Sequence, residues 1–226
     1  MLQMSLLSAA VTMVCMVGAA QAHFVWLEYD GNGPARAYFG EWAEDVREKM
    51  GGALDRIKTP HAFVASSQDP LPIERRADHL EIALTSAGDI RLIESGMPPR
   101  DNQREGGKTR TVFYARAGRS ETVGKLDLEL VPTTANSNTF VLLFHGAPLA
   151  KTNVTVLGPP KWEKPLRTDE QGRITVPAPW AGRYVLTVVY VEDKAGNAGS
   201  ENFDRTRHVA TLSFVQPDGE PWPAHR

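Results

Sequence analysis

The sequence has almost no cysteine, no surplus of charge of either sign and no complete catalytic motif. Cys15 is the single cysteine among 226 residues, which excludes an internal disulfide and a thiolate zinc site. Lys and Arg total 25 against 27 Asp and Glu, and this formal net charge of −2 disfavours nucleic-acid binding. Gly-x-Ser-x-Gly, His-Glu-x-x-His and phosphate-binding glycine motifs are missing. We therefore expect neither an enzyme nor a nucleic-acid-binding protein.

Proline and glycine are abundant, at 16 and 19 residues, and they separate short runs rich in β-branched and aromatic residues. This pattern predicts a mainly β protein made of two antiparallel β-sandwich domains with one short helix. The helix is expected within residues 42–57, where Val46, Met50 and Leu54 have helical spacing. Gly51-Gly52 interrupts that spacing and should keep the helix short.

The first 22 residues have the features of a signal peptide. Leu6 to Ala20 is apolar and uncharged, and Ala20-Gln21-Ala22 places small residues where a signal peptidase cleaves. Residues 1–5 contain no Lys or Arg, which is atypical for such a signal. We predict a periplasmic protein whose mature chain begins at His23 and contains no cysteine.

The remaining chain divides by composition into two β-rich halves. We predict an N-terminal domain at 23–131, a polar linker at 132–138 and a sandwich domain at 139–217. The proline-containing end of the chain, 218–226, is predicted to be a flexible tail.

Three motifs of the second half resemble the carboxypeptidase-regulatory or transthyretin-like sandwich. They are Gly-Ala-Pro-Leu-Ala-Lys-Thr-Asn-Val-Thr-Val at 146–156, Thr-Asp-Glu-Gln-Gly-Arg at 168–173 and Ala-Gly-Arg-Tyr-Val-Leu-Thr at 181–187. The resemblance implies an immunoglobulin-like or transthyretin-like fold for this half. It implies no chemistry, because this fold carries many unrelated functions.

The mature chain as a whole resembles an exported bacterial family, domain of unknown function 4198. The resemblance rests on Ala-His-Phe-Val-Trp-Leu-Glu at 22–28 and on His-Val-Ala-Thr-Leu-Ser-Phe at 208–214. Members are labelled as periplasmic components of nickel or cobalt uptake. This implies a non-enzymatic, metal-linked role beside a membrane metal transporter. Tyr190 stands where relatives carry His, and His-rich stretches are lacking, which weakens nickel specifically.

The histidines are the candidate metal ligands. After cleavage, the free α-amine and the ring Nδ1 of His23 could chelate one ion, and His208 or His79 could complete the site. Nitrogen ligands of this kind suit Cu(II), Ni(II) or Co(II), and no organic cofactor is expected. His145 is a less favoured partner, and His61 and His225 look like loop and tail residues.

Each histidine also has a plain structural interpretation. His23 could simply begin the first strand, and His208 could be an exposed strand-end residue among arginines. The alternative function is therefore an envelope module that binds a protein or glycan without metal. Trp162 and Trp180 are candidates for such a surface, although core packing is the plainer explanation of both.

Overall fold

The computed structural model describes residues 23–102, 106–159 and 161–221. The predicted signal peptide, 1–22, and residues 222–226 of the predicted tail lie outside the described residues. The prediction of a mainly β protein with one short helix is confirmed for the described part. Within that part, no helix is long and apolar enough to cross a membrane.

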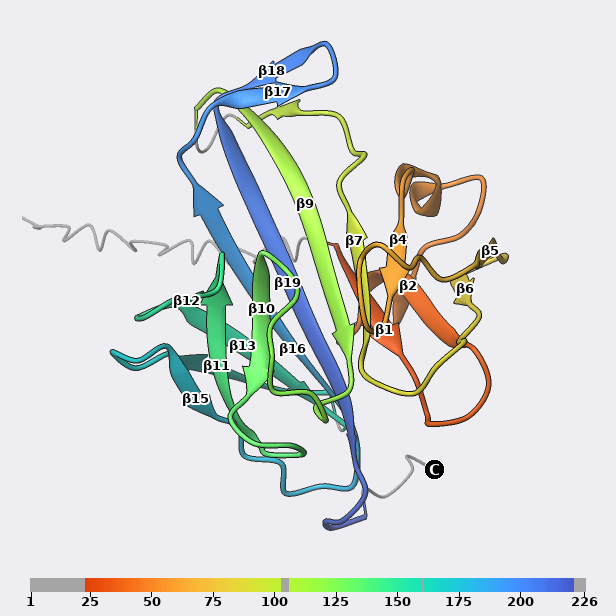
Figure 1. Cartoon of the computed structure of the whole chain (residues 1–226), viewed down its shortest axis with the longest axis vertical. Coiled ribbons are helices and arrows are strands. Elements are labelled where there is room, and N and C mark those ends of the chain that lie inside the picture. The colour runs from red at the N-terminus through yellow and green to blue at the C-terminus, as the bar shows by residue number, and fades with distance from the viewer. Residues whose placement is uncertain (1–22, 103–105, 160, 222–226) are drawn as a thin grey trace, which may run out of the picture.

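An eight-stranded sheet forms the centre of the molecule and takes strands from both predicted halves. β9 and β19 run parallel from the Thr109–Arg205 pair to the Ala117–Ser213 pair, and every other pairing in this sheet is antiparallel. Figure 1 shows these long strands side by side through the middle of the molecule. The strand order is β14 (Trp162–Arg167), β13 (Asn153–Gly158), β16 (Gly182–Glu192), β19 (Arg205–Gln216), β9 (Lys108–Ala117), β7 (Ile90–Glu94) and β4 (His61–Phe63), with β8 (Arg100–Asp101) also paired to β9.

A five-stranded sheet packs on one face of the central sheet. The hydroxyl of Thr211 donates to the Val25 carbonyl at 2.8 Å, and the hydroxyl of Ser213 donates to the Leu27 carbonyl. These side chains satisfy backbone acceptors at the open edge of the first strand, which would otherwise lie buried and unpaired. This sheet contains β1 (Phe24–Glu28), β2 (Ala35–Glu41), β6 (Leu80–Ile82), β5 (Ile73–Arg75) and β3 (Val46–Arg47).

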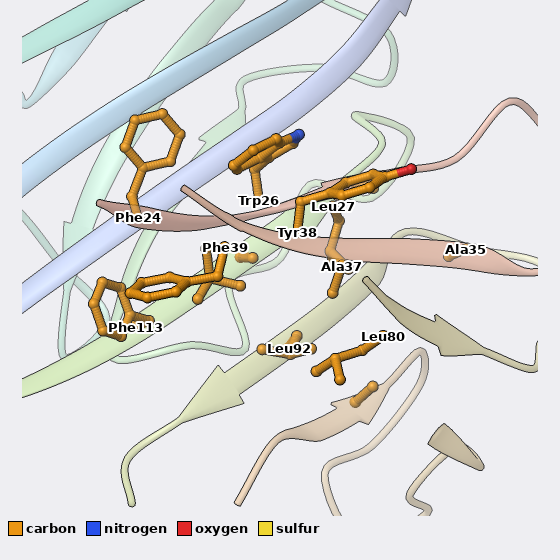
Figure 2. Close-up of a cluster of buried hydrophobic side chains, with 14 of the residues drawn as sticks. Phe24, Trp26, Leu27, Ala35, Ala37, Tyr38, Phe39, Leu80, Leu92 and Phe113 are labelled. Carbon is orange, nitrogen blue, oxygen red and sulfur yellow. The ribbon is translucent and has the colours of Figure 1, made fainter. Parts of the chain in front are cut away.

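A four-stranded sheet covers the opposite face. Because side chains alternate along a strand, β9 contributes Phe113 to the core under the five-stranded sheet and Tyr114 to the core under the four-stranded sheet. Figure 2 shows Phe113 against Phe39 in the first core. The four strands are β10 (Leu128–Pro132), β11 (Thr139–Phe144), β12 (Ala147–Pro148) and β15 (Arg173–Thr175), and a separate hairpin contains β17 (Gly196–Ala198) and β18 (Glu201–Phe203).

The predicted linker, 132–138, connects two strands of one sheet. β10 and β11 pair from Leu128–Phe144 to Pro132–Phe140, so the polar residues between them form a hairpin connection. The central sheet also takes β4, β7, β8 and β9 from before this segment and β13, β14, β16 and β19 from after it. The structure therefore stacks three layers around a common sheet, where the sequence predicted two separate sandwiches.

The predicted helical spacing within 42–57 gives only one turn of helix. A 3₁₀ helix, η1, covers Ala53–Arg56, while Val46 forms part of β3. Leu54 is buried, but Val46 and Met50 are 39% and 43% exposed. The apolar spacing did not mark one buried helical face, because Gly51-Gly52 separates a strand from the 3₁₀ turn.

A buried ionic network joins β10 to the central sheet. Arg91 and Arg116 are fully buried and both donate to Glu129 Oε1, at 2.8 and 2.9 Å. Arg116 also contacts Asp89 Oδ2 at 2.5 Å. Burial alone raises the pKa of Asp89, but hydrogen bonds from Ser120 and Arg116 outweigh it and hold that pKa below its ordinary value.

Candidate functional site

A cavity of about 440 Å³ lies on the face of the central sheet that carries Tyr114 and His208. Its walls come from strands β7, β9, β16 and β19, from the ends of β10 and β11, and from the β17–β18 hairpin. The titratable residues of the lining are Arg110, Tyr114, Asp127, His145, Glu192, Lys194 and His208. We call this the histidine cavity.

His208 is the most buried histidine of the cavity, with 4% of its surface exposed. Its ring stacks on Tyr114 with 5.8 Å between the centroids, and its Nδ1 lies 3.1 Å from the Tyr114 hydroxyl. Its Nε2 is buried and has no hydrogen-bond partner among the described residues. The nearest acidic oxygen, Glu192 Oε2, lies 3.4 Å from Nε2 but outside hydrogen-bond geometry.

The position of the Tyr114 proton determines which nitrogen of His208 is free. Burial, followed by the charge of Asp127, raises the pKa of Tyr114, so its hydroxyl remains a donor. The hydroxyl donates to Asp127 Oδ2 at 3.3 Å, since a charged acceptor gives the stronger hydrogen bond. His208 Nδ1 then donates to the hydroxyl oxygen, and a neutral ring leaves a lone pair on Nε2.

The electrostatics of the cavity favour that neutral ring. Burial lowers the pKa of His208 below its ordinary value of 6.5, although the Glu192 carboxylate acts in the opposite direction. A lone pair and a carboxylate oxygen therefore face one another inside the cavity. Two acceptors at this distance are satisfied by a shared cation or by a shared proton.

His145 lies at the rim of the cavity. Its ring centroid is 6.4 Å from that of His208, and its Nδ1 is 3.4 Å from Asp127 Oδ1. The side chain is 51% exposed, so it has room to change rotamer. Arg110 and Lys194 also line the cavity, and their charges balance those of Asp127 and Glu192.

The donor set fits a transition metal ion. Imidazole nitrogen and carboxylate oxygen are ligands for Zn, Cu, Ni and Co, and an unpartnered buried imidazole nitrogen is the position such an ion would take. In the described part of the chain, no three His, Cys, Asp or Glu residues are already grouped to hold a metal. His208 Nε2 and Glu192 Oε2, 3.4 Å apart, are thus two potential ligands within one cavity, with His145 at its rim.

His23 lies on the other face of the central sheet. It lines a separate cavity with Phe113 and Arg207, which alternate with the residues of the histidine cavity along β9 and β19. Its ring nitrogens are engaged, with Nδ1 3.2 Å from Glu41 and Nε2 2.5 Å from Glu48.

His79 occupies a third position, beside β6. Its Nδ1 is 2.7 Å from Asp78 Oδ1, its ring packs on Tyr38 at 5.5 Å, and its buried Nε2 has no hydrogen bond within the described ranges. The structure therefore does not bring His23, His79 and His208 together in one site. His61 contacts the Ser67 carbonyl at 2.7 Å, and His225 lies outside the described residues.

Sequence reasoning identified His208 but missed Glu192 and Asp127 as its neighbours. Glu192 comes from the end of β16, two residues beyond Tyr190, which pairs with His208 across the sheet. Both segments could be predicted as strands from the sequence. The register that places the end of β16 beside His208 of β19 could not be predicted, because it depends on contacts between distant segments.

Comparison with known proteins matches one part of the chain to a family. No curated protein and no solved structure matches. Residues 104–192 match the model of a family described as "Domain of unknown function (DUF4198)". The matched segment includes Tyr114, Asp127, His145 and Glu192 but ends before His208. The central part of this chain is therefore similar to DUF4198 domains.

Proposed function

We propose that this protein binds a divalent transition metal ion, copper, nickel or cobalt, through His208 Nε2 and the Glu192 carboxylate. The observation that carries the proposal is the buried Nε2, which makes no hydrogen bond within the described residues and lies 3.4 Å from a carboxylate oxygen of Glu192. A neutral imidazole is the form that binds metals, and burial already favours it by lowering the pKa of His208.

A site with only His208 and Glu192 as protein ligands suits reversible binding rather than permanent storage. Two protein ligands leave coordination positions open for water or for a partner's ligand, and the balancing charges of Arg110 and Lys194 limit the attraction for a cation. His145, exposed at the rim, is the residue through which an ion would enter or leave. This arrangement supports a delivery role beside a membrane metal transporter.

Two further proposals place this role in context. The uncharged run and small residues before His23 support export to the periplasm, and the motifs of the second half support a transthyretin-like arrangement of its strands. His23 then belongs to a different site, because its cavity lies on the opposite face of the central sheet.

Titration of the purified protein with Cu(II), Ni(II) and Co(II) tests the metal proposal. We expect one equivalent to bind more tightly than about 10 μM, and His208→Gln and Glu192→Gln each to weaken binding by roughly tenfold or more. His61→Gln is the matched control, since His61 does not line the histidine cavity and its Nε2 contacts the Ser67 carbonyl. Glu192 is 26% exposed, so its variant should fold normally.

The titrations contradict the proposal if both cavity variants bind metal as the parent protein does. Loss of binding in His61→Gln alone would contradict it as well. Thermal unfolding of each variant, followed by circular dichroism, separates loss of a ligand from loss of the fold.

A further inference from the structure

The cavity on the His23 face has a lining unlike that of the histidine cavity. It measures about 270 Å³ and is bordered by Arg56, Arg100 and Arg207. Among the described residues, no Asp or Glu lines it. Three guanidinium groups around one small cavity create a local positive potential that favours an anion. We call it the arginine cavity.

Strand pairing fixes two of these arginines toward the cavity. Arg100 lies directly opposite Thr109 in the antiparallel β8–β9 pair, so both side chains project from the same face. Arg207 lies opposite Thr111 in the parallel β19–β9 pair, so these two side chains also project from one face. Arg56 reaches the cavity from the end of η1. The arginines therefore converge from three elements that are distant in sequence.

Arg56 and Arg100 are exposed and form no ion pair with any carboxylate in the part of the chain that the structure describes. Elsewhere in the protein, arginines such as Arg91 and Arg116 form ion pairs with acidic residues. The charges of Arg56 and Arg100 are thus left for a ligand.

Thr109 supplies the strongest sign of a ligand. Only 6% of the residue is exposed, its hydroxyl oxygen is buried, and it lines the cavity. Its hydroxyl has no hydrogen-bond partner within the described residues. Buried hydroxyls are normally paired, because an unmade hydrogen bond costs about 1–3 kcal/mol. An acceptor oxygen in the cavity would satisfy this donor.

The floor of the cavity is apolar. Phe39 and Phe113 meet edge to face with 5.8 Å between ring centroids, and Met97 and Pro98 complete the wall. Figure 2 shows the two phenylalanine rings adjacent to each other between the two sheets. A ligand with only a charged group would leave this surface without a partner.

We propose that the arginine cavity binds a small organic carboxylate with an apolar body. The carboxylate accepts hydrogen bonds from the arginines and from Thr109 Oγ1, and the apolar body rests on Phe39 and Phe113. The two cavities lie on opposite faces of one sheet, so this site is independent of the proposed metal site.

Benzoate is the probe for this proposal, because it joins a carboxylate to an apolar ring. Calorimetric or NMR titration of the purified protein should give saturable binding of benzoate. Benzamide lacks the charge and acetate lacks the ring, so both should bind roughly tenfold or more weakly. The double variant Arg56→Gln/Arg100→Gln should lose benzoate binding by a similar factor. Both side chains are exposed, so the variant should fold.

The matched control is Arg173→Gln, an exposed arginine of β15 in the four-stranded sheet. It should bind benzoate as the parent protein does. Equal binding of benzamide and benzoate, equal binding of acetate and benzoate, or unchanged binding in the double arginine variant would each overturn the proposal.

Discussion

The two faces of the central sheet carry opposite chemistry, although the same strands build both. β19 gives His208 to one face and Arg207 to the other, and β9 does the same with Tyr114 and Thr109. The histidine cavity pairs a neutral nitrogen with a carboxylate, whereas the arginine cavity is lined by arginines and by no Asp or Glu among the described residues. Alternation of side chains along a strand is therefore sufficient to give the two cavities different linings and to keep the two proposed sites apart.

The largest effect is expected from Arg116→Met on the face that carries the four-stranded sheet. This variant leaves the buried Asp89 without its cation, while Glu129 keeps Arg91, and the loss should cost about 3–5 kcal/mol in the free energy of unfolding. Arg100→Gln at the exposed arginine cavity should cost less than about 0.5 kcal/mol. Urea unfolding measures the free energy of unfolding of both variants. Similar losses of stability in the two would contradict the contrast between buried and exposed arginines.

Tyr114→Phe should affect only the histidine cavity. It removes the hydroxyl beside His208 Nδ1 and so releases the orientation of the ring, with a loss of metal affinity of about 10–100-fold. Benzoate binding should stay unchanged, because Tyr114 points away from the arginine cavity. Metal and benzoate titrations of this one variant compare the faces directly. A loss of both activities would show that the two sites are coupled.

Acid should lower the free energy of unfolding through the ionic network around Asp89. The pKa of Asp89 is lowered in the folded protein, so the unfolded chain binds a proton more readily than the folded chain. The contribution of Asp89 is therefore fully present above its ordinary value of 3.8 and is lost as the pH falls further. Urea midpoints at a series of pH values should show this loss, and Asp89→Asn should reduce its slope. An equal slope in the variant would assign the acid sensitivity to other groups.

Thr109→Val is expected to have the smallest effect on stability. The variant replaces a buried, unpartnered hydroxyl with a methyl group of similar shape, which should change the free energy of unfolding by less than about 1 kcal/mol, in the stabilising direction. Benzoate binding should weaken at the same time. Opposite changes in stability and binding would identify Thr109 as a ligand contact, while a clear destabilisation would mean that its hydroxyl already has a partner.

The sequence predicted local features better than their assembly. Short strands and the weak helix could be predicted, because Gly51-Gly52 and the many turns act within a few residues. The pairing of β9 with β19 could not be predicted, because the two strands are about a hundred positions apart in the chain and their parallel register leaves no local pattern. The single sheet shared by both halves follows from that pairing.

The candidate sites show the same limit. His208 could be selected by residue type, but its burial, its Tyr114 contact and its Glu192 neighbour depend on the fold. His23 and His208 were predicted to share an ion because no local sequence pattern shows that they lie on opposite faces of the central sheet. Thr109 and the arginines carried no motif, and only their strand pairing revealed a common cavity.

The position of β19 has a consequence for how the chain reaches its final form. This strand lies between β16 and β9 in the sheet, yet among the described strands it comes last in the chain. Until Arg205–Gln216 is inserted, both neighbours present open edges and the hydroxyls that cap β1 are missing. The central sheet therefore cannot close until β19 is in place. A chain that ends before β19 would expose two strand edges and would be prone to aggregate.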